Sequence, residues 1–215
     1  MGTGNADLPQ QWTLDAGKVW YLTALGGIVT AFGVVLFGWL GGVDRLNFTI
    51  TVTPGQSGVP ILAAAGAAAV LAVLGLFFVH EWCHGLAFRW AGARPRYGAK
   101  LVAWFFPVFY ATAPGHWLTK RQYLTVVLAP TVVVNLAGLG ALLAFPTVGL
   151  WLIGPLAFHL GGCVGDWWMA VVIARLPAGT LFEDTRDGFR YRPDAEPCSG
   201  PSGMSRSSST ATSGE

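Results

Sequence analysis

Residues 59–88 read VPILAAAGAAAVLAVLGLFFVHEWCHGLAF, an apolar run with two histidines and a glutamate near its end. The run is long enough to cross a bilayer as a helix. His80 and His84 are four residues apart, so on a helix both imidazoles project from one face and can bind one metal ion. Glu81 lies about 100° round the same turn, within reach of a water at that metal. Because ionisable groups at membrane depth are costly, we interpret this HExxH group as functional.

The composition is that of a membrane protein. Hydrophobic residues make up 53% and charged residues 11% of the 215, and the mean hydropathy is +0.52. Soluble domains carry about 25% charged residues. The net charge of +2, without a basic patch, argues against a nucleic-acid partner. The three cysteines form no disulfide framework, and the polar first 18 residues are not a cleavable signal peptide.

Four apolar runs predict four transmembrane helices, at 19–40, 59–88, 123–145 and 150–174. We therefore expect an all-α integral membrane protein, with a membrane domain at 19–192, an N-terminal segment at 1–18 and a disordered tail at 193–215.

Two short segments break this pattern. Residues 101–113 are apolar but too short to span and contain Pro107, which predicts a re-entrant or β-like element between the second and third helices. The alternation at 47–53 suggests a short extended segment.

The basic residues predict the orientation. With four spans, the two termini and the segment 89–121 share one side of the membrane. That side carries twelve of the thirteen lysines and arginines, and Arg45 alone lies on the other side. Basic residues are enriched in cytoplasmic loops. We therefore expect a multi-pass protein of the cell membrane with both termini in the cytoplasm.

A catalytic zinc site needs a third protein ligand and an open position. The candidates are His116, Asn135, His159, Asp166 and the acidic residues of the tail. We compared them by depth in the membrane, because ligands of one ion must lie in the same layer.

Depth favours Asp166. His80 precedes Arg89, the first charge beyond its span, by nine residues, and Asp166 precedes Arg175 by the same number. Both therefore lie about 13 Å from the cytoplasmic ends of their helices. Apart from Glu81, no other carboxylate lies in the predicted spans, and a buried carboxylate must be paired, protonated or metal-bound. The alternative is a salt bridge to an arginine of the loop after residue 88, such as Arg94 or Arg96.

Two further polar residues lie at membrane depth. His159 is seven residues before Asp166, about 10 Å further from the cytoplasmic side, unless the glycines of 161–165 break the helix. Asn135 lies at the middle of the third span. Each can donate a hydrogen bond to an oxyanion or hold a ligand in place, and helix–helix hydrogen bonding explains each equally well. Cys83 and Cys163 fit the role of small packing residues.

The chain resembles the intramembrane zinc metalloproteases of the site-2 protease type, in which an HExxH helix pairs with an aspartate of a later transmembrane helix. It resembles more closely the family described as putative zincin peptidases, over about residues 75–192. The matching stretches are Val79–Gly85, Ala111–Gly115, Gly162–Asp166 and Phe182–Thr185. Two departures from the site-2 pattern are Trp167, where a glycine usually follows the aspartate, and the lack of an Asn-Pro pair before it.

These observations predict a membrane-embedded zinc endopeptidase. One Zn²⁺ per chain would be held by His80, His84 and Asp166, with Glu81 as general base and a membrane protein or peptide as substrate. The alternative is a metal-binding transporter or non-catalytic membrane partner that uses the same ligands. A Glu81→Gln variant separates the two, because only a peptidase would lose its activity while keeping its zinc.

Overall fold

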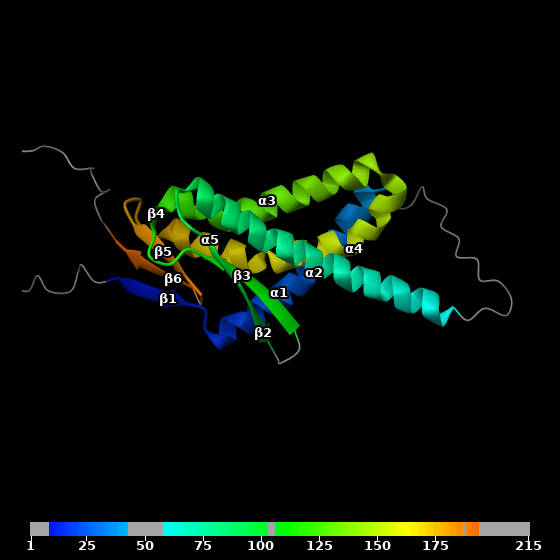
Figure 1. Cartoon of the computed structure of the whole chain (residues 1–215), viewed down its shortest axis with the longest axis horizontal. Helices are drawn as coiled ribbons and strands as arrows, with labels where there is room; N and C mark the ends of the chain where they lie inside the picture. Colours follow the sequence, from blue (N-terminus) through cyan, green and yellow to red (C-terminus); the bar gives the residue numbers. More distant parts are fainter. Residues whose placement is uncertain (1–8, 43–57, 103–105, 187, 194–215) are drawn as a thin grey trace, which may run out of the picture.

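The structure is a computed structural model that describes residues 9–42, 58–102, 106–186 and 188–193. It is mostly helical, with one small sheet at one end of a helical bundle and a two-stranded hairpin beside the bundle (Figure 1). The helices are α1 (Ala16–Leu40), α2 (Val59–Trp90), α3 (Lys120–Ala144), α4 (Pro146–Gly162) and α5 (Val164–Arg175). The strands are β1 (Gln10–Thr13), β2 (Arg96–Val102), β3 (Phe106–Thr112), β4 (Trp117–Thr119), β5 (Leu181–Thr185) and β6 (Gly188–Arg192).

Four helical stretches are long and apolar enough to cross a membrane: Gly17–Leu40, Leu62–Trp90, Lys120–Ala144 and Trp151–Arg175. They coincide with the four predicted spans, so the prediction of four such helices is confirmed. Most of their apolar surface faces outward, as expected for helices that present their side chains to lipid. The predicted extended segment at 47–53, Arg45 and residues 194–215 of the tail lie outside the described residues.

The fourth span is two helices, where the sequence predicted one continuous helix. α4 ends at Gly162 and α5 begins at Val164, with Cys163 between them. The amide of Cys163 is shared between the carbonyls of His159 and Leu160, at 3.0 and 3.2 Å, which tightens the last turn of α4. The glycines on both sides of Cys163 lower the helix propensity locally. The break places His159 on the last turn of α4 and Asp166 on the first turn of α5.

The expectation of an all-α fold was wrong in one respect, because the described residues form two antiparallel sheets. β2 and β3 form a hairpin, with Arg96 opposite Thr112 and Val102 opposite Phe106. This hairpin is the β-like element predicted at 101–113, although it starts five residues earlier. The second sheet has the order β1-β6-β5-β4 and combines strands from both ends of the described chain. Such non-local pairing has no short-range signal in the sequence.

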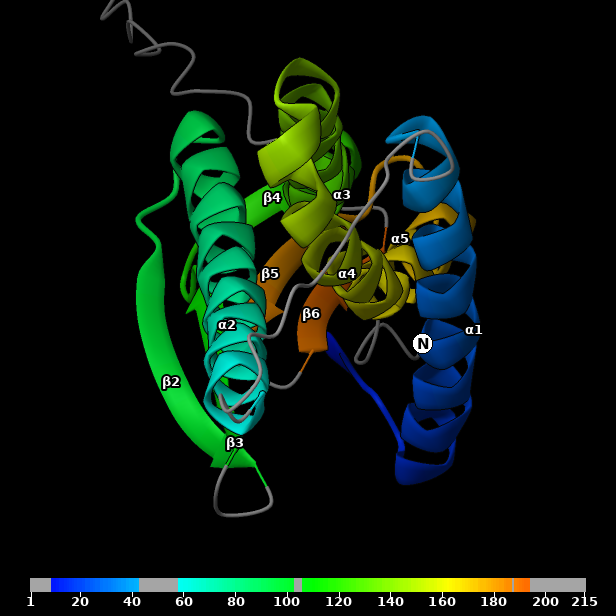
Figure 2. The same cartoon turned by 90° about the vertical axis from the view of Figure 1, so that its right-hand side faces the viewer.

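The helices pack in an order that differs from their order in the chain. Figure 2 shows α4 and α5 lying between α1 on one side and α2 on the other, with the hairpin along the outer side of α2. α1 and α4 approach closely at glycines: a Cβ added at Gly33 would lie 3.0 Å from the Cα of Ala157. Small residues at helix interfaces permit such close backbone approach in membrane bundles.

The core at the sheet end of the bundle joins the second sheet to the helices. Tyr123 of α3 stacks on Phe182 of β5, with ring centres 5.4 Å apart, and Phe189 of β6 packs against both rings. All three side chains are fully buried. α3 starts here with a capping box between Thr119 and Gln122, which satisfies backbone amides of its first turn. This corner packs against the end of α2, where Ala87 and Phe88 belong to the same cluster of buried residues as the three rings.

Candidate metal centre

His80 and His84 lie one turn apart near the end of α2 and point towards each other. Their Nε2 atoms are 3.1 Å apart. The side chains are only 7% and 12% exposed. The four-residue spacing on a helix produces this arrangement, as the sequence predicted.

Asp166 completes the group from the first turn of α5. Its Oδ2 lies 3.2 Å from the Nε2 of His80, and its Oδ1 lies 3.8 Å from the Nε2 of His84. Among the described residues, Oδ2 is buried and has no hydrogen-bond partner. The charged contacts of Asp166 within the described chain are to these two histidines. The alternative, a salt bridge to Arg94 or Arg96, is not among them.

Both histidines use Nδ1 for contacts outside this group. The Nδ1 of His84 donates to the backbone carbonyl of Val126 at 2.8 Å. Because a carbonyl only accepts, that nitrogen carries the proton, and the Nε2 of the neutral ring keeps its lone pair. The Nδ1 of His80 lies 3.1 Å from the Nε2 of His159. Both Nε2 atoms are therefore free to bind a metal ion.

His159 lies directly behind His80, on the side away from Asp166. It is buried, and its Nδ1 lies 3.8 Å from the Sγ of Cys163. His80, His159 and Cys163 form a second group of potential ligand atoms within 4.8 Å of one another. The helical rise places His159 about 10 Å from the layer of Asp166, and the ring of His80 lies between the two, with one ring nitrogen near each.

Asn135 is the candidate that the structure does not bring to the group. Its Nδ2 donates to the carbonyl of Thr131 at 2.7 Å, one turn earlier on α3. It does not line the cavity next to His84 and Asp166. His116, in the segment between β3 and β4, is also absent from that lining.

Glu81 lines the same cavity as His84 and Asp166, and its side chain is hydrogen-bonded to β3. Its Oε2 accepts a hydrogen bond of 2.8 Å from the amide of Ala111 in β3. The cavity has a volume of about 180 Å³ and its lining includes Glu81, His84, Asp166, Tyr123 and Asp184. A second cavity, of about 260 Å³, shares Glu81 and Tyr110 with it and is otherwise lined by apolar and aromatic groups. Glu81 therefore separates a polar cavity from an apolar one.

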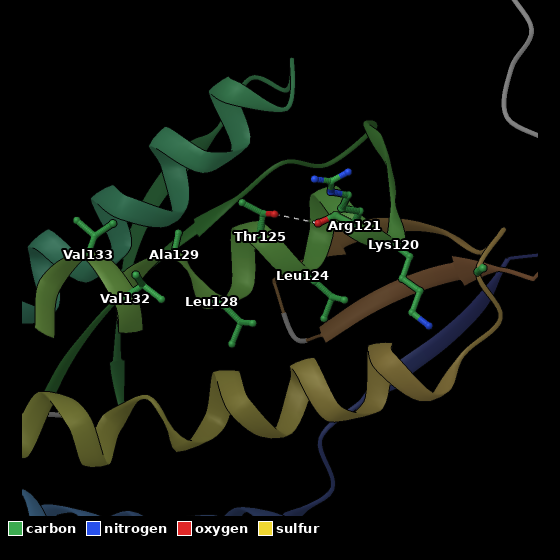
Figure 3. A pocket seen from close by; sticks show the side chains of 9 residues that line it. Lys120, Arg121, Leu124, Thr125, Leu128, Ala129, Val132 and Val133 are labelled. Carbon is green, nitrogen blue, oxygen red and sulfur yellow. Dashed lines mark hydrogen bonds between the residues drawn. The ribbon is translucent and has the colours of Figure 1, made fainter. Parts of the chain in front are cut away.

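A larger cavity lies elsewhere. It has a volume of about 790 Å³ and follows one face of α3, where Leu124, Leu128 and Val132 form an apolar groove below Lys120 and Arg121 (Figure 3). It contains none of the histidines or carboxylates of the metal group, so the volume of a cavity does not identify that group.

Sequence reasoning missed two carboxylates near the group. Glu183 and Asp184 of β5 are buried, and Asp184 Oδ1 accepts a hydrogen bond of 2.7 Å from the hydroxyl of Tyr123. Burial, together with the nearby Glu81 and Glu183, raises the pKa of Asp184 from 3.8 to about 7. The stretch 182–185 was noticed only as part of a resemblance. Two adjacent acids next to an apolar strand were the signal that could have identified them.

The geometry of His80, His84 and Asp166 and a match to a protein family indicate the same class of protein. The model of the family described as "Putative zincin peptidase" matches residues 73–181, half of the chain, and the chain belongs to this family. The matched region contains His80, Glu81, His84 and Asp166, and it ends just before the stretch 182–185. The family assigns the chain to the zinc peptidases. No curated protein and no solved structure matches it.

Proposed function

We propose that this protein is a membrane-embedded zinc endopeptidase that cuts peptide bonds in or near the membrane. The observation that carries the proposal is the convergence of His80 Nε2, His84 Nε2 and the Asp166 carboxylate within 3.1–3.8 Å of one another. A pair of histidines with one carboxylate is a ligand set of catalytic zinc sites. The two histidines come from an HExxH helix and the aspartate from a later helix, which supports a relationship to the site-2 protease type.

The donor atoms fit one Zn²⁺ ion per chain. Nitrogen and oxygen ligands about 2.0–2.2 Å from a tetrahedral zinc ion lie about 3.3–3.6 Å from one another, which is close to the distances given above. The buried Oδ2 of Asp166, which has no hydrogen-bond partner in the described chain, would be satisfied by the ion. The two Nδ1 contacts fix the ring orientations, as outer partners of zinc-binding histidines commonly do.

Glu81 is the general base of the proposed reaction. When bound, Zn²⁺ polarises the scissile carbonyl and lowers the pKa of a water molecule. Glu81 takes the proton of this water during the attack on the carbonyl and returns it to the leaving amine. Its Oε2 is held by Ala111, so Oε1 is the oxygen available for proton transfer. His159 holds His80 from behind rather than contacting substrate, and we assign no catalytic role to Asn135.

We infer that the site and its substrate lie in the cytoplasmic half of the membrane. Four apolar helices support a multi-pass protein, and the basic residues of the sequence support cytoplasmic termini. A membrane protein or peptide would lie along β3, whose residues next to Ala111 border both cavities. An extended substrate can pair with the outer edge of such a strand. Its side chains would then fit the apolar cavity next to Glu81.

The decisive test compares the wild type with Glu81→Gln. Both proteins, purified in detergent, are analysed for zinc and then incubated with a membrane-protein fraction, and new N-termini are identified by mass spectrometry. We expect about one zinc per chain in both, and cleavage by the wild type alone, reduced at least about 100-fold in the variant. Equal zinc with no Glu81-dependent cleavage, together with zinc flux in proteoliposomes, would support the transporter instead.

A further inference from the structure

Three carboxylates receive hydrogen bonds from one segment of chain. The amide of Ala111 donates to Glu81 at 2.8 Å, the amide of Ala113 donates to Asp184, and the amide of Gly115 donates to Glu183 at 2.7 Å. Ala111 lies in β3, Ala113 directly follows the strand, and Gly115 lies in the turn after it. The end of β3 and the turn that follows are thus bound at every second residue by an acid.

The three acids come from two different parts of the fold. Glu81 is on α2, whereas Glu183 and Asp184 are neighbours on β5. In Figure 1 the hairpin lies along α2, and the chain then leads to the end of the bundle where β4 and β5 lie. The segment 111–115 therefore connects the second sheet to the end of the HExxH helix.

We propose that Glu183 and Asp184 are positioning residues for Glu81. They hold residues 113–115 in place, and this keeps the amide of Ala111 on Oε2 of Glu81 and its Oε1 directed to the reacting water. The proposal rests on the proposed role of Glu81 as general base. It gives a physical role to the two stretches of the resemblance that carry no obvious chemistry, 111–115 and 182–185.

The two positioning acids are themselves firmly held. Glu183 accepts a second hydrogen bond, of 2.9 Å, from Arg190 on β6, and its side chain is 4% exposed. Asp184 is held by the hydroxyl of Tyr123, whose ring is buried against Phe182. Both acids are therefore fixed relative to α3 and the second sheet. Through their hydrogen bonds they also fix the end of β3.

The strand end depends on these acids because its own sequence offers little else. Pro114 has no amide and cannot continue a ladder. Gly115 has a φ of +81°, a conformation that glycine adopts without strain. Without Asp184 and Glu183, the amides of Ala113, which is buried, and of Gly115, which is exposed, would lose these acceptors, and the loss is costly where no water replaces the acceptor. The segment would then shift, and Ala111 would move with it.

The test uses paired variants of the full-length protein. Asp184→Ala and Glu183→Ala remove the acceptors, whereas Asp184→Asn and Glu183→Gln keep an oxygen that can accept the same hydrogen bond. Tyr191→Phe is the control, because it removes one hydrogen bond of the same sheet, to Gln10, far from residues 111–115. The measurements are zinc content, hydrogen–deuterium exchange of the peptide covering 109–116, and kcat and KM on a substrate found with the wild type.

We expect the alanine variants to keep zinc and KM, to exchange faster at 111–115, and to lose kcat by about 10–100-fold. The amide variants should recover kcat to within about threefold of the wild type, and Tyr191→Phe should match the wild type.

Unchanged kcat in the alanine variants despite faster exchange would overturn the proposal. Amide variants with a kcat as low as that of the alanine variants would also overturn it. The negative charge of the two acids would then matter, and not the hydrogen bonds that hold the segment. Equal rates in wild type and Glu81→Gln would instead refute the proposed function, and unchanged exchange at 111–115 in the alanine variants would refute the positioning role by itself.

Discussion

The Nδ1 of His80 lies 3.1 Å from the Nε2 of His159, and both side chains are buried. With Zn²⁺ on the Nε2 of His80, which faces Asp166 and His84, Nδ1 would carry the proton and His159 would accept this hydrogen bond. A histidine that accepts from a ligand is unusual, because carboxylates and carbonyls commonly take that role. Being neutral, His159 adds no second negative charge next to Asp166.

His159 should therefore affect metal affinity more than folding. We expect His159→Phe to weaken zinc binding by about 10–100-fold, because His80 loses the partner that fixes its tautomer and orientation. His159→Gln, whose side-chain oxygen can accept the same bond, should lose much less. Competition with a zinc chelator measures both. Equal affinity in wild type and His159→Phe would contradict the assigned role.

Removal of the carboxylate ligand should have a larger effect. Asp166→Ala is expected to weaken zinc binding by more than about 100-fold, which exceeds the loss from removing a residue that contacts only a ligand, such as His159. The purified variant should then carry well under one zinc per chain. Elemental analysis measures this directly. Asn135→Ala serves as the control, since Asn135 bonds to the backbone of its own helix and should leave zinc unchanged. Equal zinc in wild type and Asp166→Ala would remove Asp166 from the ligand set.

The close approach of α1 and α4 predicts opposite effects for two adjacent glycines. A Cβ at Gly26 would lie 2.9 Å from the carbonyl oxygen of Gly161, whereas a Cβ at Gly27 would meet nothing within 4 Å. We expect Gly26→Ala to lower stability by about 1–3 kcal/mol, because backbone must move. Gly27→Ala should be neutral or raise it by up to about 1 kcal/mol through helix propensity. Thermal unfolding in detergent compares them, and equal melting temperatures would argue against this helix contact.

Asp184 should make stability depend on pH. Its folded pKa of about 7 lies above its ordinary value of 3.8, so the folded state binds the proton more tightly than the unfolded state. The stability from this group is fully present below about pH 4 and is lost as the pH rises to 7, by on the order of 4 kcal/mol. Asp184→Asn, which stays neutral, should show a flatter profile between pH 4 and 7. Parallel profiles of wild type and variant, from thermal unfolding at several pH values, would contradict the raised pKa.

Several features could be predicted from the sequence because their signals are local. Apolar runs of more than 20 residues determine four long helices through length and hydropathy alone. The spacing of His80 and His84 places their imidazoles together through helix geometry. The depth argument for Asp166 compared distances along two predicted helices, and in the structure Asp166 lies next to both histidines. It did not need to know which helices are neighbours.

Other features could not be predicted, since they depend on contacts between distant segments. The second sheet pairs β1 with β6, about 180 residues apart, as in the register of Gln10 with Tyr191. The contact of His159 with His80 depends on how α2 packs against α4, and the glycines of 161–165 indicated only that a break in the helix was possible. For Asn135 the sequence left a role at the site and hydrogen bonding between helices open. Its side chain bonds to Thr131 of its own helix, a choice that hydropathy does not record.

The sequence by itself determined the helices and the pair of histidines, because both follow from repeat distances within one segment. Only the tertiary structure decided how Glu81 is held, since its partner Ala111 lies on a strand 30 residues away. The same is true of Glu183 and Asp184, whose amide donors come from a turn almost 70 residues earlier. Hydrogen bonds of this kind depend on backbone direction, and backbone direction is set by packing.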